Sequence, residues 1–521
     1  MLHLLAALCF ALLCVWLAIG QARYWASRGV EHVTCLQFIR NTVRMYYTPL
    51  HIIWQEVYKQ HGPITGTFTM ATPTLMVADP VLLKDIMVKN FGSFPNTEFI
   101  RQVGDPVLDN MLVSLLNKEW HVTRNIVSPI FSTSKMKQMV VTVNECAKDM
   151  VRNFADAARE GKPYDVKLIF GAFGLDVTAQ TTFSFRLDSH RDVHNPFVLQ
   201  AKRFFAAEYN WRAFLSFQFP RLSALAGLRI FCPDAVEYFS GVMTDLLRRR
   251  AANDKNDKLD FVRLLMNAEC QNEEGSPQKD TGKRVLTRDQ VLAQAVLFFV
   301  AGYDTTTIAM SMAVYYLARN KEIQARLIDE IEGVLKKQKE VTYEVVMGLE
   351  YLDAVIMEVL RMNPSVHMTY RTCVRSTMVG KIAIDEGTLI RIPIFSIQHD
   401  EKYFPDPEVF DPERFLGKNK ERVVPFTFLP FGEGPRQCVG MKFACMNIKL
   451  GLFHALSRFS FETSSETQVS EHALQVVPGV TKQGNIISES QVTKIPPKYQ
   501  PSILLLLPYD VKLRVIDRKS Q

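Results

Sequence analysis

The stretch FGEGPRQCVG, residues 431–440, decides more about this chain than any other part of its sequence. It places Cys438 in a loop rich in glycine and arginine, directly before a pattern typical of a helix. A thiolate that binds a metal must stay ionised and aimed, and backbone N–H groups of such a loop stabilise its charge. The alternative is a buried structural cysteine, since most free cysteines behave as small apolar residues. The surrounding residues favour the interpretation of Cys438 as a metal ligand; they are Phe431, Gly434, Arg436 and Gly440.

These residues resemble the haem-binding signature of the cytochrome P-450 family, the haem-thiolate monooxygenases, with phenylalanine, glycine, arginine, cysteine and glycine at the family's spacing. The resemblance implies haem b as the cofactor and Cys438 as the axial ligand of its iron. It also implies that Phe431 covers the sulfur and that Arg436 reaches a haem propionate. Gly434 and Gly440 would let the backbone approach the porphyrin closely.

Composition limits the remaining possibilities. The chain has 521 residues, of which 47% are hydrophobic and 11% aromatic, and this fits a large buried core. A net charge of +7 suits an anionic membrane surface or an acidic protein partner, and no basic arm points to nucleic acid. The 9 cysteines are odd in number and unclustered, which predicts reduced thiols in a cytosol-facing domain.

The N-terminus carries a candidate membrane anchor. The stretch 4–20 contains no charged residue and would span about 26 Å as a helix, near the short end of a membrane span. The first charged side chains, Arg23 and Arg28, follow it, so the positive-inside rule places the main body in the cytosol. We therefore expect residues 1–22 to form a single-pass anchor in the endoplasmic reticulum membrane, with a cleaved signal peptide as the alternative.

Between this anchor and the catalytic domain, expected at residues 61–521, we expect a linker over residues 23–60. The family usually has a proline-rich hinge there, whereas this linker contains only Pro49. Because prolines stiffen a linker, the sequence predicts a weakened hinge.

Helical patterns dominate the catalytic domain. They fill most of residues 117–399 and return at 444–459, and residues 80–90 predict a short helix. Strand signals occur at 64–68, 74–77, 378–384 and 388–394. The sequence therefore predicts a mainly α chain with small β-sheets, of class α+β. The resemblance implies the cytochrome P-450 fold, a triangular helix-rich body with a long central helix over the haem.

The candidate central helix covers residues 287–320. Thr287 and Gln290 fit a capping box at its start, and its nearly all-apolar interior indicates a buried helix. Asp304 and Thr305 interrupt this interior, and polar groups there are costly unless they are used or satisfied.

The stretch AGYDTT, residues 301–306, resembles the family's oxygen-activation segment. The resemblance implies that Ala301 lies against the haem, that Thr305 holds a water or oxygen ligand, and that Asp304 connects it to a proton source. The alternative is a threonine hydroxyl that bonds back to a helix carbonyl.

A second motif is Glu358 and Arg361, which share a helix face. The default interpretation of such a pair is a solvated surface ion pair. With Arg414 in the later stretch DPERF, however, they resemble the family's Glu–Arg–Arg network, whose role is structural.

Further cations match haem-binding positions of the family. Trp120 and Arg124 lie four apart on one expected helix face, and the resemblance has them bonding the propionates together with Arg371 and Arg436. Thr97 departs from the pattern, because related members often carry arginine there. Lys135, Lys137 and Lys442 match the face on which a reductase would dock, although an ordinary solvated surface explains them as well.

Substrate contacts are expected from segments that match the family's substrate-lining regions. These segments are rich in Phe, Leu and Val, which favours apolar ligands. The candidate lining residues are Phe298, Val366, His367 and Thr369. The aromatic segment 206–230 is a candidate second membrane contact.

Together these features predict a membrane-bound haem-thiolate monooxygenase that inserts one oxygen atom of O2 into an apolar small molecule. Electrons would come from NADPH–cytochrome P-450 reductase, with cytochrome b5 as a further partner. The stretch 441–450 is similar to mammalian drug-metabolising microsomal enzymes and to their thromboxane synthase relative. A peroxide isomerase or dehydratase of the thromboxane synthase type is therefore the alternative, and a non-catalytic haem- or steroid-binding protein is a third. Thr305 argues against both. Steroids, fatty acids and xenobiotics fit the apolar lining equally well.

Overall fold

The computed structural model describes most of the chain after residue 22. The described residues are 23–45, 47–69, 72–97, 105–187, 189, 196–205, 226–227, 231–252, 261–266, 286–338, 340–467, 499, 505–506 and 508–519. The expected membrane anchor at residues 1–22 and nearly all of the expected membrane contact at 206–230 lie outside them.

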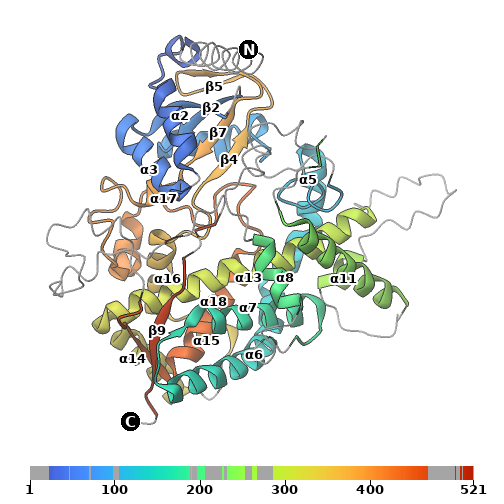
Figure 1. Cartoon of the computed structure of the whole chain (residues 1–521), viewed down its shortest axis with the longest axis vertical. Coiled ribbons are helices and arrows are strands. Elements are labelled where there is room, and N and C mark those ends of the chain that lie inside the picture. Colours follow the sequence, from blue (N-terminus) through green and yellow to red (C-terminus); the bar gives the residue numbers. More distant parts are fainter. Residues whose placement is uncertain are drawn as a thin grey trace, which may run out of the picture.

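The largest sheet has four strands in the order β1-β2-β7-β4. β1 and β2 pair antiparallel, β2 and β7 pair parallel, and β7 and β4 pair antiparallel. Figure 1 shows this sheet at one end of the molecule, with α2, α3 and α17 beside it. The bounds of these elements are β1 (Ile64–Thr69), β2 (Thr72–Val77), β4 (Thr369–Thr372), β7 (Leu389–Ile392), α2 (Cys35–Arg44), α3 (Leu50–His61) and α17 (Ile394–Gln398).

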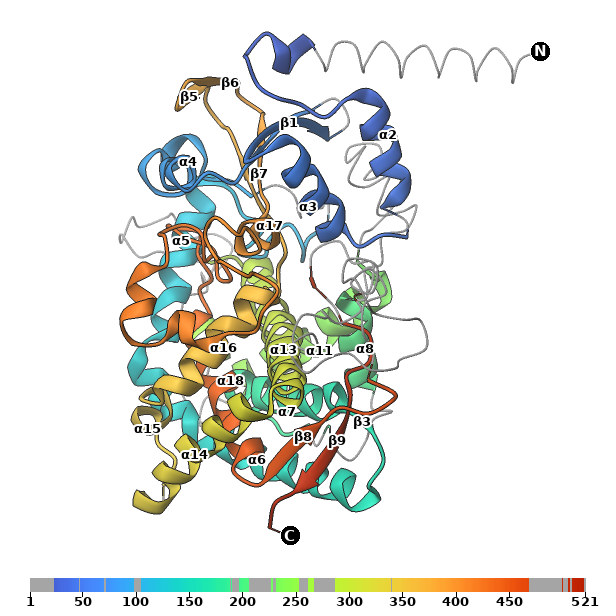
Figure 2. The ribbon, with the colours of Figure 1, turned by 90° about the vertical axis from the view of Figure 1, so that its left-hand side faces the viewer.

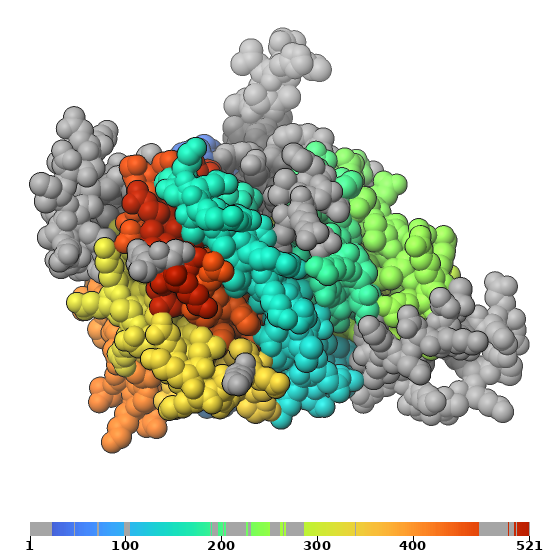
Figure 3. Space-filling view, turned by 90° about the horizontal axis from the view of Figure 1, so that it is seen from below, coloured from blue at the N-terminus to red at the C-terminus, as the bar shows by residue number. Residues whose placement is uncertain are grey.

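Two smaller sheets complete the β structure. One is a three-stranded sheet in the order β3-β9-β8, and the other is a hairpin of β5 and β6. Their strands are β3 (Tyr164–Asp165), β5 (Thr377–Val379), β6 (Ile382–Ile384), β8 (Phe459–Glu462) and β9 (Lys512–Asp517). Figure 3 shows the end of the molecule opposite the large sheet, where segments coloured teal, yellow and red form one continuous face.

Helices form the rest of the body, and α13 runs through its middle (Figures 1 and 2). The helices are α4 (Pro80–Lys84), α5 (Asn117–Val127), α6 (Thr133–Glu160), α7 (Val166–Phe183), α8 (Pro196–Phe205), α11 (Pro233–Ala252), α12 (Phe261–Met266), α13 (Arg288–Arg319), α14 (Lys321–Lys337), α15 (Tyr343–Met347), α16 (Glu350–Met362) and α18 (Met441–Leu456). The short helical turns are η1 (Asp85–Lys89), η2 (Phe91–Ser93), η4 (Ser128–Phe131), η5 (Pro412–Phe415) and η6 (Gly417–Arg422). The predicted mainly α fold with small sheets is confirmed.

The predicted central helix begins with the predicted capping box. The Thr287 hydroxyl accepts a hydrogen bond from the Gln290 N–H at 3.2 Å, and the Gln290 side chain accepts one from the Thr287 N–H at 3.1 Å. Among the described residues, α13 is the one helix long and apolar enough to cross a membrane. Most of that apolar stretch is buried inside the protein, which identifies α13 as a core helix.

Small residues bring α13 into direct contact with its neighbours α7 and α18. A Cβ atom at Gly451 of α18 would lie 2.4 Å from the Met310 sulfur of α13 and 3.0 Å from the Phe173 ring of α7. A side chain at position 451 would have to displace the Met310 sulfur and press on the Phe173 ring, so glycine lets both side chains pack directly on the α18 backbone. The three helices therefore pack closely at this point.

The structure differs from the sequence predictions in three places. In the expected linker, Trp25 is fully buried and donates from Nε1 to the Thr67 carbonyl at 2.9 Å, and α3 packs against the large sheet. Trp25 and the buried face of α3 thus belong to the folded body, whereas α2 keeps apolar side chains exposed. The helix expected at 80–90 becomes a π-helical turn after Lys84, and the helix expected at 444–459 begins at Met441 and ends at Leu456.

Candidate active site

A cavity of about 330 Å³ lies between α13 and the loop that carries Cys438. Its wall is mostly apolar. The α13 side contributes Phe298, Ala301, Gly302, Thr305 and Thr306, and the facing loop contributes residues 436–440. The remaining wall comes largely from α5, β4 and the turns before α5. Among the described residues that line the cavity, Cys438 is the only cysteine.

Backbone hydrogen bonds hold the loop around Cys438. The Cys438 N–H donates to the Phe431 carbonyl at 2.8 Å, and the Gln437 N–H donates to the Gly434 carbonyl at 3.0 Å. Gly434 has φ +75°, and a Cβ there would lie 2.1 Å from the Met87 carbonyl oxygen of η1. Glycine at this position therefore lets the loop pack directly on the η1 backbone.

The Cys438 side chain faces the cavity, so solvent-sized molecules reach it from that side. Protein atoms surround it elsewhere, and this burial raises the pKa of its thiol. The Gly440 backbone and the charge of Arg124 act in the opposite direction. Gly440 is also the N-cap of α18, so the sulfur lies beside the positive end of a helix. A thiolate at this position has its negative charge stabilised by fixed dipoles.

Arginines surround the cavity near the sulfur. Arg436 donates from Nε to the Pro95 carbonyl at 2.8 Å and from Nη2 to the Leu115 carbonyl at 2.8 Å, and it lies over the Trp120 ring at 4.2 Å. Arg371 is buried, donates from Nη1 to the Tyr370 carbonyl at 2.8 Å, and leaves Nε without a partner.

These arginine charges are electrostatically costly. Burial lowers the pKa of Arg371 to about 10. Burial, followed by the charges of Arg371 and Arg124, lowers the pKa of Arg436 to about 9. No carboxylate among the described residues forms an ion pair with Arg124, Arg371 or Arg436. One buried and two half-buried cations without a counter-charge suit a ligand with an anionic edge. Apolar walls and a facing thiol suit haem, and the residues present therefore fit that cofactor.

The two expected catalytic residues of α13, Thr305 and Asp304, differ in their position relative to the cavity. Thr305 lines the cavity, and its hydroxyl donates to the Ala301 carbonyl at 2.9 Å. This back-bonding is the alternative that the sequence left open for a threonine inside a helix. Asp304 is half-buried and is not among the residues that line the cavity.

Of the four expected substrate-lining residues, Phe298, Val366 and Thr369 line the cavity. His367 does not line it; its ring lies 6.1 Å from that of His51, in the buried region between α3 and α17. The sequence singled out Thr97 only as a departure from the family pattern. The structure places it in the cavity wall, where its hydroxyl donates to the Val113 carbonyl at 2.9 Å.

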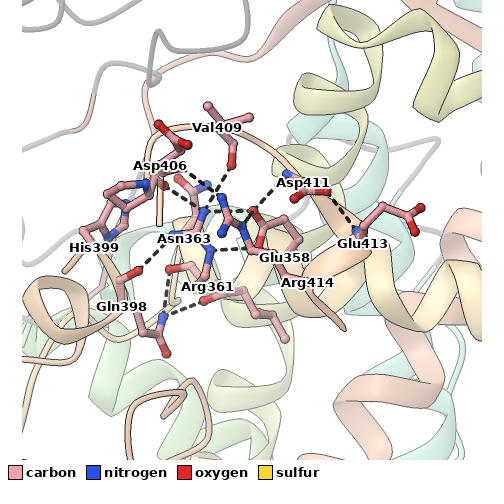
Figure 4. Close-up of polar contacts among 12 residues, drawn as sticks. Glu358, Arg361, Asn363, Gln398, His399, Asp406, Val409, Asp411, Glu413 and Arg414 are labelled. Carbon is pink, nitrogen blue, oxygen red and sulfur yellow. Dashed lines mark hydrogen bonds and ion pairs between the residues drawn. The ribbon is translucent and has the colours of Figure 1, made fainter. Parts of the chain in front are cut away.

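Figure 4 shows the contacts of Glu358 on α16. Arg361 donates to its carboxylate from Nε at 2.7 Å and from Nη2 at 2.8 Å, and the Asp411 N–H donates to it at 3.0 Å. Arg414 lies at 3.5 Å from the same carboxylate. Burial raises the pKa of Glu358, and these arginines and the N–H group oppose that rise.

Arg361 extends this network into the loops that follow. It is fully buried and donates to the Gln398 carbonyl at 2.9 Å and to the Pro407 carbonyl at 2.7 Å. Gln398 in turn accepts the Leu429 N–H at 2.8 Å, next to the loop that carries Cys438. The network thus connects α16 to the base of that loop.

The three lysines expected on a docking face make only polar surface contacts. Lys137 pairs with Glu344 at 2.5 Å, Lys442 lies 3.3 Å from the Thr133 hydroxyl, and Lys135 lies 3.3 Å from the Gln138 side chain. Lys442 follows the Cys438 loop directly, at the start of α18.

Comparisons with known proteins agree with this arrangement. A family model described as Cytochrome P450 matches residues 34–485. Cytochrome P450 3A9 of Rattus norvegicus is 34% identical over 417 residues, which cover 79% of this chain and 81% of the relative. Cytochrome P450 3A16 of Mus musculus is 34% identical and Cytochrome P450 3A5 of Homo sapiens 33% identical, each over 85% of this chain and 87% of the relative.

Proposed function

Because the chain belongs to the cytochrome P450 family, we propose that Cys438 is the thiolate that binds its haem iron. The chain is a cytochrome P450 monooxygenase, an oxidoreductase whose cofactor is haem with an axial cysteine thiolate. One observation carries the assignment to this residue. Cys438 is the only cysteine among the described residues that line the cavity, and it faces α13 across it.

We further propose that the cavity arginines bind the anionic edge of the haem. Arg124, Arg371 and Arg436 border the cavity without a carboxylate partner among the described residues, and Trp120 stacks against one of them. Hydrogen bonds from charged donors to carboxylates are the strong ones, and they gain strength where water is excluded. In this proposal Ala301, Phe431, Gly434 and Gly440 provide close approach and shielding.

When bound, the haem supplies the activation of O2. The proposed task of this chain's residues is to orient the substrate, exclude water and deliver protons. Thr305 is within the cavity wall, and its hydroxyl can exchange its bond to the Ala301 carbonyl for a bond to a ligand in the cavity. Asp304 precedes it on the same helix and is proposed to supply protons from outside the cavity.

The proposed substrate is an apolar small molecule such as a steroid, a fatty acid or a xenobiotic, since the cavity wall is mostly apolar. The proposed electron donor is an NADPH-dependent reductase, with cytochrome b5 as a further partner. A peroxide isomerase would not need a proton-delivering residue, and Thr305 in the cavity wall therefore supports the monooxygenase.

We also propose that the body rests on the endoplasmic reticulum membrane, held by residues 1–22. Support comes from α2, where Leu36, Ile39 and Val43 are 78%, 49% and 56% exposed. Their spacing places them on one helix face, and an exposed apolar stripe of this kind suits a lipid surface.

A reduced-plus-carbon-monoxide difference spectrum tests the ligand. The wild type should show the strongly red-shifted Soret band of thiolate-ligated haem, and Cys438→Ala should lose it. Cys445→Ala is the matched control, since Cys445 lies on α18 shortly after the loop and does not line the cavity. A band at the imidazole position in the wild type, or an unchanged band in Cys438→Ala, would contradict the proposal.

A second measurement tests proton delivery. In Thr305→Val the ratio of oxygenated product to NADPH consumed should fall, by about ten-fold or more if the hydroxyl takes part in proton transfer. Thr307→Val is the control, because Thr307 is buried on the same helix, bonds back to Tyr303 at 2.9 Å and does not line the cavity. An equal ratio of product to NADPH in the wild type, Thr305→Val and Thr307→Val would show that the Thr305 hydroxyl does not take part in proton delivery.

A further inference from the structure

A buried glutamine on α13 holds the backbone of the turns before α5. Gln294 is fully buried, and its Oε1 accepts the Leu112 N–H at 2.8 Å. Its Nε2 donates to the Asn110 carbonyl at 2.7 Å and to the Gln290 carbonyl, one turn back on α13, at 3.0 Å. Each polar atom of this side chain is therefore used, and two of its three bonds cross to another part of the chain.

The same turns are held from the opposite side by the Cys438 loop. Arg436 donates to the Leu115 carbonyl at 2.8 Å and lies 3.5 Å from the Leu112 carbonyl. Thr97 adds a bond to the Val113 carbonyl at 2.9 Å. Leu112 is thus bonded through its N–H to α13 and through its carbonyl to the loop that faces α13 across the cavity.

Residues 105–116 depend on these side chains because they form only turns. Their own backbone bonds include Ser114 to Met111 at 2.8 Å and Leu115 to Met111 at 3.0 Å. Buried backbone groups that lack a ladder must find partners among side chains. Gln294 and Arg436 supply these partners, so they decide which conformation of the turns is stable.

The turns also form part of the cavity wall, to which Leu112 and Val113 contribute. A shift of this backbone would therefore move apolar surface into or out of the cavity. Pre-organised walls bind a ligand more tightly, because no ordering has to occur on binding.

We propose that Gln294 is a positioning residue that sets the substrate preference of the cavity by fixing the backbone at residues 110–112. The inference rests on the proposed function in one respect, namely that the substrate occupies this cavity. Gln294 itself does not line the cavity, so it acts through the turns that it holds.

Hydrogen exchange on the full-length haem-loaded protein tests the contact directly. In Gln294→Leu, which keeps the bulk and removes the polar atoms, the Leu112 amide should exchange about ten-fold faster than in the wild type. Gln294→Glu keeps an acceptor for the same N–H but loses the donor to the Asn110 and Gln290 carbonyls, and it should therefore restore only part of the protection.

Gln324→Leu is the matched control. Gln324 on α14 is also buried. It accepts the Phe461 N–H at 2.7 Å and donates to the carbonyls of Leu317 and Phe461 at 3.1 and 3.0 Å. It does not line the cavity, and none of these bonds is to the turns at residues 105–116. It should leave exchange at Leu112 unchanged. Equal acceleration in both leucine variants would mean a general loss of stability and would overturn the proposal.

Binding probes of two sizes test the consequence for selectivity. Imidazole is a small probe of the cofactor site, whereas 4-phenylimidazole adds a phenyl ring that has to be accommodated by the cavity wall. Gln294→Leu should weaken 4-phenylimidazole by about ten-fold and change imidazole binding by less than about two-fold. For a substrate that the enzyme oxidises, Gln294→Leu should raise KM by a larger factor than it lowers kcat.

The two proposals fail in distinguishable ways. The reduced-plus-carbon-monoxide spectrum of the same preparations reports the thiolate and fails if the proposed function is wrong. With a normal spectrum, unchanged exchange at Leu112 in Gln294→Leu, or equal effects on both imidazoles, would refute the positioning role alone.

Discussion

Buried arginines occur in two contrasting regions of this protein. Behind the Cys438 loop, Arg361 is fully buried and is bonded to a carboxylate and to the Gln398 and Pro407 carbonyls. Beside the cavity, Arg371 is buried to a similar degree, yet within the described part of the chain its one hydrogen bond is to the Tyr370 carbonyl and its Nε has no partner. The first arginine completes a network within the chain, and the second does not.

This difference distinguishes an arginine that stabilises the fold from an arginine that binds a ligand. A buried charge is tolerated when paired and hydrogen-bonded, and it is costly otherwise. Arg361 is compensated by the chain itself, so its effect should fall on folding. The lowered pKa of Arg371, caused by burial, marks an uncompensated cation, so its effect should fall on an anionic ligand. Four predictions test this contrast, from the largest expected effect to the smallest.

Removing Arg361 should produce the largest effect. Arg361→Ala leaves Glu358 buried without its main partner and should lower the free energy of unfolding by about 3–5 kcal/mol. Denaturant unfolding and the yield of folded protein measure this. The control is Arg326→Ala, which breaks an exposed ion pair with Glu413 and should cost about 1 kcal/mol or less. Equal costs for the two variants would contradict the network's importance.

Replacing Arg371 should affect the cofactor more than the fold. Arg371→Leu removes an uncompensated cation, so the polypeptide should lose less stability than in Arg361→Ala, while haem should dissociate roughly 10- to 100-fold faster. Transfer of haem to an excess of apomyoglobin measures the dissociation rate. Arg375→Leu is the control, because Arg375 is exposed and does not line the cavity. Haem loss at the wild-type rate would show that Arg371 does not bind the propionates.

Acid should weaken the network region through His399. Burial, followed by the nearby charge of Arg361, lowers the pKa of this histidine to about 3. Below about pH 6.5 the unfolded chain therefore binds a proton that the folded protein does not. As the pH is lowered, the free energy of unfolding decreases by up to about 1.4 kcal/mol per pH unit.

His399→Gln keeps a donor for the Phe395 carbonyl, which His399 contacts at 2.9 Å, and should remove most of this slope. Denaturant unfolding between pH 7 and pH 5 measures it, with about 2 kcal/mol expected from the residue over that range. The same replacement at His454, whose pKa burial lowers to about 4, is a second case. A variant as acid-sensitive as the wild type would exclude His399 as a cause.

Arg414 should matter least. It lies 3.5 Å from Glu358, donates to the Asp406 carbonyl at 3.0 Å, and keeps 14% of its side chain exposed. Arg414→Ala should therefore cost about 1 kcal/mol, because Arg361 continues to compensate the carboxylate. Thermal unfolding of both single variants and the double variant measures the coupling. A cost as large as that of Arg361→Ala would mean that the two arginines act as one unit.

Local sequence patterns predicted the parts of the fold that local interactions determine. The capping box at Thr287 is where it was predicted, and the strand signals at 64–68 and 74–77 correspond to β1 and β2. Glu358 and Arg361 were recognisable because their spacing on one helix face is itself the contact. The site loop was recognisable for the same reason, since its glycines and arginine are neighbours in sequence.

Contacts between distant segments were not predictable in this way. Nothing near Gln294 in the sequence indicates that its side chain meets Leu112, which is 182 residues away. Trp25 was expected in a linker, and only its contact with Thr67 reveals that it belongs to the core. His367 lies between lining residues, but its ring packs toward His51 of α3, a contact with a segment far away in the sequence.

The glycine contact at Gly451 limits how this enzyme can be altered. There the Met310 side chain of α13 and the Phe173 ring of α7 lie directly on the α18 backbone, so a larger residue at position 451 would have to displace one of them. Such a change would disturb the packing between the helix that begins beside Cys438 and the helix that carries Thr305. We therefore expect new specificities to come from substitutions in the cavity wall, and substitutions at this three-helix junction to reduce stability.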